Sequence, residues 1–161
     1  MSDALISQNG KLGTVRNPGE PQTVKLYYGN EDLEVPYSNS ALPDIGPRFA
    51  LGAFIRSFEN IFFRQYPFAQ ATFHSTLTGK PSPLAFTLAK NLLSAQLPHP
   101  PSDLFMIGDS LHSDIRGGNA NGFQTILVRT GGNYRGEEIT DPACQPTHIV
   151  EDVREAVQKV I

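Results

Sequence analysis

The chain has 161 residues, and its 13 Lys and Arg against 16 Asp and Glu give a formal net charge of −3. This length suits one domain's worth of chain with a hydrophobic core, and a weakly acidic sequence without a basic stripe argues against nucleic-acid binding. No run approaches the roughly 18 consecutive apolar residues of a membrane-spanning helix. The single cysteine, Cys144, excludes an intramolecular disulfide framework and a cysteine-based zinc site.

The first half of the chain predicts one clear helix among loops and short strands. The predicted elements are irregular chain over 1–22, a strand over 24–28, a loop over 34–49, a helix over 50–65 and a strand over 71–74. Seven of the ten Phe lie between Phe49 and Phe73, which indicates a packed core more than a ligand-stacking surface.

The second half alternates helices with short apolar strands. The predicted elements are a helix over 83–96, a strand over 104–107, a short helix over 114–121, strands over 125–128 and 147–150, and a helix over 152–160. This order favours an α/β fold with a parallel sheet. Ser82-Pro83 is a good helix start, because Ser accepts from free N–H groups and Pro suits the first helical position. The residues expected to face inward from that helix are Ala85, Leu88, Ala89, Leu92 and Leu93.

Two aspartates follow the strand predicted at 104–107. In Gly108-Asp109-Ser110-Leu111-His112-Ser113-Asp114, Asp109 would project from the carboxyl end of a parallel strand, where ligands of open α/β sheets bind. Two carboxylates on one turn suit Mg²⁺, which takes one or two carboxylates together with waters and phosphate oxygens. The alternative is structural: Asp109 as a turn residue and Asp114 as a helix N-cap.

A lysine precedes the helix predicted at 83–96. Lys80, in Thr78-Gly79-Lys80-Pro81, lies at the positive end of that helix dipole, where a bound phosphate would offset the repulsion. An ordinary surface lysine is the alternative. One helix and one strand separate Lys80 from Asp109, so both should emerge at the same edge of a parallel sheet. A lysine beside two carboxylates suits phosphoryl chemistry.

These runs resemble a known family. GKPSPLAFTLAKNLL followed by MIGDSLHSDIRGGNANGFQTILVRTG is similar to the haloacid dehalogenase (HAD) superfamily, subfamily IIA, and most of all to its mitochondrial branch of the cat eye syndrome critical region type. Upstream, LYYGNEDL and PRFALGAF look like the end of that subfamily's α/β cap. The resemblance implies the end of a cap with its return linker over 1–77, and the C-terminal half of a Rossmann-like core over 78–161.

The resemblance also implies an activity. Most members are Mg²⁺-dependent phosphatases that form an aspartyl-phosphate. By match, Asp109 would hold Mg²⁺, Asp114 would support it, and Lys80 would neutralise the nucleophile and the phosphoryl oxygens. Expected substrate contacts are Gly79 and Ser110, within the matched motifs, and Asn30 and Asp32, which match an Asn-Pro-Asp turn in which Glu31 replaces the Pro.

One motif of the family has no match. The nucleophile belongs to an Asp-x-Asp motif, and no two aspartates of this chain are two residues apart. We therefore expect the C-terminal portion of such a phosphatase, inactive alone; the alternative is a non-catalytic or partner-dependent binding module. The strand at 104–107 would lack a neighbour, which invites self-association or pairing with another chain. A small phosphorylated metabolite as substrate, a mitochondrial location and a place in glycerophospholipid metabolism are implied by the resemblance alone.

Overall fold

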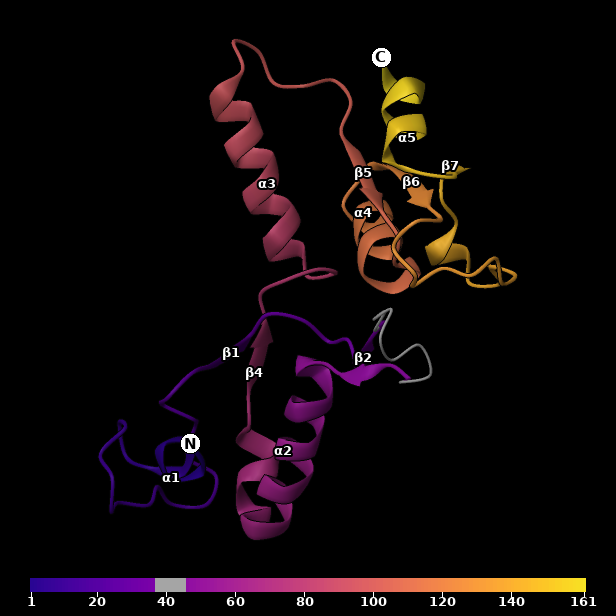
Figure 1. The fold of residues 1–161 in the computed structure, drawn as a ribbon. Helices are drawn as coiled ribbons and strands as arrows, with labels where there is room; N and C mark the ends of the chain where they lie inside the picture. The colour runs from indigo at the N-terminus through magenta and orange to yellow at the C-terminus, as the bar shows by residue number, and fades with distance from the viewer. Residues whose placement is uncertain (37–45) are drawn as a thin grey trace. The chain divides into compact units, whose positions relative to one another are not determined.

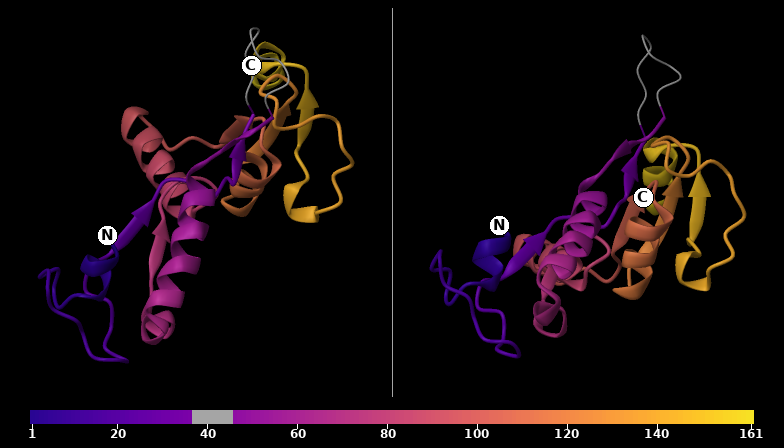
Figure 2. Two further views of the ribbon diagram at one scale, coloured as in Figure 1. Left: turned by 60° about the horizontal axis from the view of Figure 1, so that its bottom comes forward. Right: turned by 90° about the horizontal axis from the view of Figure 1, so that it is seen from below.

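The computed structural model describes residues 1–36 and 46–161, which form two compact units, Met1–Thr78 and Gly79–Ile161. Figure 1 labels the elements of each unit, and Figure 2 gives two further views. The identity of the first unit as the end of a cap and of the second as half of a core remains a prediction.

The first unit combines one long helix with two small sheets. Its elements are α1 (Ser2–Ile6), β1 (Leu26–Tyr28), β2 (Glu34–Val35), β3 (Arg48–Phe49), α2 (Leu51–Gln65), the 3₁₀ helix η1 (Pro67–Thr72) and β4 (Ser75–Leu77). β1 pairs with β4 in parallel, and β2 pairs with β3 in an antiparallel arrangement. The helix expected over 50–65 is confirmed. The strand expected over 71–74 is wrong: η1 ends at Thr72, within that stretch, and pairing with β1 starts at Ser75.

The core of the first unit is built around Phe62, which is 1% exposed. Its ring centroid lies 5.3–5.9 Å from those of four aromatic neighbours, which are Phe58, Phe63, Tyr66 and Phe73. Leu5 and Ile6 of α1 and Ala69 of η1 complete the cluster. The predicted phenylalanine core is therefore correct for this group. It is wrong for Phe49 and Phe54, which are 81% and 65% exposed. The stretch over 1–22, expected to be irregular or only partly structured, contains α1, whose Leu5 and Ile6 are buried in this core.

The second unit is a three-stranded parallel sheet with helices. Its elements are α3 (Pro83–Gln96), β5 (Phe105–Gly108), the π-helical turn η2 (Leu111–Ile115), α4 (Arg116–Ala120), β6 (Gln124–Val128), the 3₁₀ turn η3 (Pro142–Cys144), β7 (His148–Val150) and α5 (Val153–Val160). The strand order is β5-β6-β7, and both pairings are parallel. The expected α/β class is confirmed.

The central strand β6 is covered on both faces. Ile126 and Val128 pack with Val150 and with Ala156 of α5, while Leu127 points the other way and packs with Ile115 and Tyr134. Alternate residues of a strand point to opposite faces, so β6 contributes to two hydrophobic clusters. Figure 1 shows α4 and α5 beside this sheet. β5 lies at the edge of the sheet, with β6 as its partner among the described strands.

The inward face predicted for α3 is wrong. Leu88 and Leu92 are 59% and 54% exposed, and the buried residue of this helix is Phe86, at 3%. Phe86 packs on Gly117, where a Cβ would lie 2.6 Å from its ring, and its centroid lies 5.4 Å from that of Phe123. The helix α3 contacts the rest of its unit near its start, through Phe86. Farther along the helix, Leu88, Leu92 and Leu93 are therefore exposed, and Ala89 is partly buried.

Candidate functional site

The carboxylate of Asp114 is the buried centre of the site. The residue is 3% exposed. Its Oδ1 accepts a hydrogen bond from Lys80 Nζ at 2.5 Å, and its Oδ2 accepts one from the backbone N–H of Ser110 at 3.1 Å. The structure thus joins Lys80, just before α3, to Asp114 in η2. The lysine side chain is 48% exposed, so its ammonium can meet a ligand while it stays paired.

The π-helical turn explains how Asp114 reaches this position. Ser110 Oγ caps the turn by accepting from Ser113 N at 3.2 Å, and the Ser110 carbonyl accepts from the N–H groups of Asp114 and Ile115 at 3.0 and 3.1 Å. The turn folds the Asp114 carboxylate back onto Gly108, the last residue of β5, where any Cβ would overlap Asp114 Oδ2. The N-cap is therefore Ser110; the alternative in which Asp114 capped a helix is wrong, because the helical turn starts at Leu111. π-Helical turns of this kind often occur at functional sites.

Asp109 is held by residues that follow the neighbouring strand. Its Oδ2 accepts from the backbone N–H and the side-chain amide of Asn133 at 3.2 and 2.7 Å. A Cβ at Gly131 would overlap the same oxygen. Because β5 and β6 are parallel, the chain leaving β6 runs past the carboxyl end of β5. We did not predict Gly131 and Asn133 from the sequence; their place just after a strand of the same sheet was the signal.

The charges of the site leave room for a cation. Lys80 compensates one of the two carboxylates, and Asp109 has no ion pair within the described parts of the chain. Over residues 1–36 and 46–161, no group of three or more His, Cys, Asp or Glu is placed to hold a metal ion. Two carboxylates are nonetheless the protein ligands that Mg²⁺ commonly uses, with waters and phosphate oxygens completing its octahedron. In kind of donor, the residues present fit such an ion.

The remaining predicted site residues lie in two places. The Gly79 carbonyl, beside Lys80, accepts from Ser82 N at 2.8 Å. Asn30 and Asp32 belong to the first unit, in the turn after β1. The Asp32 carbonyl accepts from Gly52 N at 2.9 Å, and Asn30 Oδ1 is buried with no hydrogen-bond partner among the described residues. The roles predicted for all of these residues remain predictions.

The family comparison agrees with this geometry. Residues 77–156 match the model of the HAD-hydrolase-like family. The second unit belongs to the HAD-hydrolase-like family. This confirms the resemblance to the HAD superfamily inferred from the motifs around Lys80 and Asp109.

Curated relatives of this HAD-like domain include two proteins with mitochondrial names. The chain is 34% identical over 157 residues to a cardiolipin synthase (CMP-forming)/mitochondrial hydrolase fusion protein of Schizosaccharomyces pombe, over 94% of this chain and 24% of that protein. It is 30% identical over 190 residues to a mitochondrial hydrolase of Saccharomyces cerevisiae, over 100% of this chain and 50% of that protein. The chain therefore spans half, or less, of the length of these relatives.

Solved structures share the fold. A hypothetical protein from Pyrococcus horikoshii, 21% identical, aligns with a TM-score of 0.59 over 85% of this chain and 44% of its own. A glycerol phosphate phosphatase from Mycobacterium tuberculosis in complex with magnesium is 25% identical and aligns with a TM-score of 0.53, over 78% of this chain and 32% of its own. No helix within the described residues is both long and apolar enough to cross a membrane.

Proposed function

We propose that this chain carries the cation- and phosphate-binding part of a HAD-like phosphatase for a small phosphorylated metabolite. The observation that carries the proposal is the Lys80–Asp114 ion pair beside Asp109 at the carboxyl end of β5. Ligands of open α/β sheets bind at this edge. The magnesium-bound phosphatase among the structural relatives supports the same assignment.

Each residue of the site has a separate role in this proposal. Asp109 and Asp114 would hold Mg²⁺, which supplies positive charge next to the phosphoryl oxygens. Lys80 donates to a phosphoryl oxygen while Asp114 orients its ammonium. Asn133 occupies one oxygen of Asp109 and leaves the other without a partner among the described residues. Gly79 and Ser110, next in sequence to Lys80 and Asp109, would contact substrate, and the same role is proposed for Asn30 and Asp32.

The cation site is testable without turnover. We expect isothermal titration of the chain with MgCl₂ to give one binding event, and Asp109→Asn or Asp114→Asn to weaken it at least about tenfold, the scale on which losses around metal sites are felt. Asp103→Asn is the matched control, because Asp103 lies just before β5 and is exposed. Equal Mg²⁺ affinity of Asp109→Asn and Asp103→Asn would refute the assignment.

The catalytic part of the proposal needs a nucleophile from outside this sequence. No Asp-x-Asp occurs in the 161 residues. We therefore expect the chain alone, with Mg²⁺, to leave p-nitrophenyl phosphate unhydrolysed, and a form that also carries an Asp-x-Asp segment to hydrolyse it in a manner that Asp109→Asn abolishes. Turnover by the chain alone would contradict this division and require another nucleophile.

The absent Asp-x-Asp also favours a second candidate, a non-catalytic phosphate-binding module. The module would bind Mg²⁺ and phosphate in the same way, but adding an Asp-x-Asp segment would produce no turnover.

The names of two relatives support a mitochondrial location for the protein. One of these relatives is a fusion with a cardiolipin synthase, which supports a place in glycerophospholipid metabolism. Organelle fractionation of the source cells with an antibody to this chain tests the location.

A further inference from the structure

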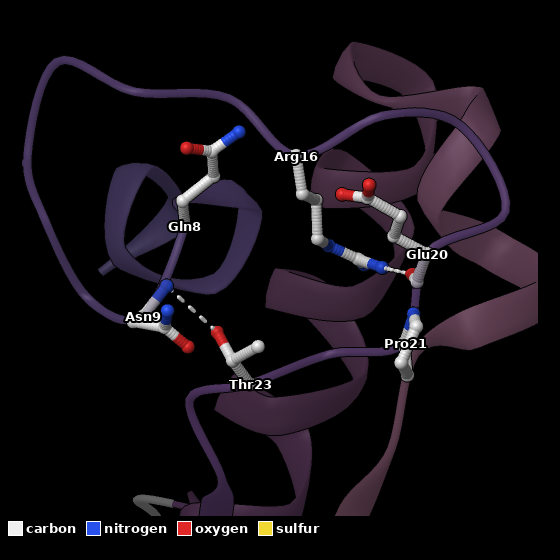
Figure 3. Close-up of a pocket in the computed structure, with 6 residues that line it drawn as sticks. All are labelled: Gln8, Asn9, Arg16, Glu20, Pro21 and Thr23. Carbon is white, nitrogen blue, oxygen red and sulfur yellow. Dashed lines mark hydrogen bonds between the residues drawn. The ribbon is translucent and has the colours of Figure 1, made fainter.

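A buried arginine in the first unit lies outside the site described above. Arg16, in the loop between α1 and β1, is 3% exposed. Figure 3 shows its side chain between Gln8 and Asn9 on one side and Glu20 and Pro21 on the other, with the guanidinium turned towards Glu20. Buried charges are normally paired, so the partners of this guanidinium decide what the residue does.

Arg16 is bonded through one of its three nitrogens. Its Nη1 donates to Thr72 Oγ1 at 2.7 Å and to the Glu20 carbonyl. Its Nε and Nη2 are buried, and neither has a hydrogen-bond partner among the residues that the structure describes. No carboxylate lies within ion-pair distance of Arg16 in the described parts of the chain; the charge that acts on it is that of Glu20, further away.

The two unbonded nitrogens share one edge of the guanidinium. Nε–H and one N–H of Nη2 are parallel, and this fork matches the two oxygens of a carboxylate or phosphate in a bidentate pair. Leaving buried charged donors unsatisfied costs more than leaving neutral ones. A molecule that supplied two anionic oxygens would remove that cost. Both the geometry of the fork and the free energy gained by satisfying its N–H groups therefore favour binding of an oxyanion.

A pocket of about 420 Å³ lies at this place, lined by Gln8, Asn9, Arg16, Glu20, Pro21 and Thr23. Gln8 adds a polar side chain to this lining, and the Asn9 N–H is bonded to Thr23 Oγ1 at 3.1 Å, which joins the two segments that line the pocket. The volume suits a small metabolite, since ligand pockets span about 300–1,000 Å³. Because Glu20 adds one negative charge to the rim, the pocket favours a ligand with a single compact anionic group over a polyanion.

The Nε and Nη2 atoms of Arg16 are shielded from solvent, so a ligand can reach them only if a neighbouring segment moves. In this proposal the segment that moves is the turn that contains Glu20. The contacts of Glu20 are local: its carboxylate accepts from Asn17 N and Nδ2 at 2.9 and 2.8 Å, its N–H donates to the Asn17 carbonyl, and its own carbonyl accepts from Arg16. Hydrogen bonds from Asn17 hold the pKa of this carboxyl below its usual value, so it is ionised near pH 7. A turn held by its own residues can shift without disturbing Phe62 and the core around it.

We propose that Arg16 anchors an oxyanion site in the first unit, which binds the carboxylate or phosphate group of a small molecule between the 8–9 and 20–23 segments. In the bound form the ligand takes both Nε and Nη2, and Thr72 keeps Nη1. The site uses no residue of the Lys80–Asp114 pair or Asp109, so we expect anion binding to be measurable without Mg²⁺.

The first test measures the NMR signal of the Arg16 side chain directly. We would record the side-chain Nε–H resonances of the ¹⁵N-labelled 161-residue chain without Mg²⁺, assign that of Arg16 by its loss in Arg16→Lys, and titrate with sodium acetate and then with inorganic phosphate. A saturable shift confined to the Arg16 Nε–H is expected with at least one of the two anions. The absence of a saturable shift with both, or equal shifts at all arginines, would overturn the proposal.

The second test separates binding from charge alone. Arg16→Lys keeps the charge but loses the fork, so we expect the affinity for the active anion to fall about tenfold, the worth of one charge-assisted hydrogen bond. Glu20→Gln removes the repelling carboxylate and should tighten binding several-fold. Arg64→Lys, an exposed exchange in α2, is the control and should change nothing. If Arg16→Lys does not fold, the Glu20→Gln affinity still decides: no tightening would count against the site.

Discussion

At the scale of single residues, Gly108 lets the backbone and a carboxylate approach closely. Gly108 lies under Asp114 Oδ2, and a Cβ there would overlap that oxygen. Gly108→Ala should therefore push Asp114 away from Lys80 and destabilise the unit by about 1–3 kcal/mol, as overpacking does. Urea unfolding measures this. Gly46→Ala is the control, since nothing lies within 4 Å of a Cβ there. Equal unfolding midpoints for the two variants would show that the contact is not tight.

Asn133 allows a separate prediction about Asp109. Asn133→Ala removes the 2.7 Å bond to Oδ2 but keeps the backbone bond at 3.2 Å. Because the residue is exposed, we expect unchanged thermal stability together with Mg²⁺ affinity that is lowered several-fold, since the carboxylate loses one of its orienting donors. Asn60→Ala, on the surface of α2, should alter neither quantity. Full Mg²⁺ affinity in Asn133→Ala would mean that the backbone N–H alone orients Asp109.

Cys144 is predicted to react slowly. Burial, then the nearby Asp141 carboxylate, raises the pKa of this thiol above its usual 9.0. The thiolate is the reactive form, so alkylation by iodoacetamide at pH 8 should be much slower in the folded chain than in urea. A raised folded-state pKa also means that this contribution to stability is present below pH 9.0 and is lost as the pH rises towards the folded value. Comparable alkylation rates with and without urea would contradict both statements.

At the scale of elements, side-chain caps fix where two helices begin. Ser82 Oγ accepts from Leu84 N at 3.3 Å at the start of α3, and Asp152 Oδ1 accepts from Glu155 N at 2.9 Å at the start of α5. Ser82→Ala and Asp152→Ala should each cost about 1 kcal/mol in unfolding free energy. The aspartate should cost more, because its bond is shorter and its charge favours the helix N-terminus. Thermal denaturation of both variants beside Ser102→Ala, a surface exchange, checks the order.

Local signals of this kind were readable in the sequence. The bounds of α2 and α3 follow from apolar spacing and from Ser82-Pro83, and the parallel pairing of β5, β6 and β7 follows from alternation. The covered face of α3 was not readable, because periodicity identifies a face without saying what packs on it. The π-helical turn η2 was not readable either. Its Asp114 contacts Lys80, which lies 34 residues earlier in the sequence, as well as Ser110, and local sequence patterns do not show such a distant contact. Asn133 was missed for the same reason.

At the scale of the whole molecule, apolar surface remains uncovered within the described chain. β5 is an edge strand, and Leu84, Leu88 and Leu92 of α3 are each more than half exposed. Unpaired edges and apolar stripes favour association. We therefore expect light scattering to show a mass that rises with concentration, and Leu88→Lys with Leu92→Lys to reduce that rise. Leu12→Lys, a similarly exposed exchange in the first unit, should not. A monodisperse, cooperatively unfolding monomer at all concentrations would contradict the expectation.

The double coverage of β6 has a consequence for how the second unit opens. Ile126 and Val128 belong to one hydrophobic cluster and Leu127 to the other, so α5 and the η2–α4 side both rest on the same strand. If the layer on one face of β6 opens locally, the strand stays packed against the layer on the other face. The backbone amides of β6 should therefore exchange with deuterium last, at a rate set by global unfolding of this unit, while those of α5 exchange earlier through fraying.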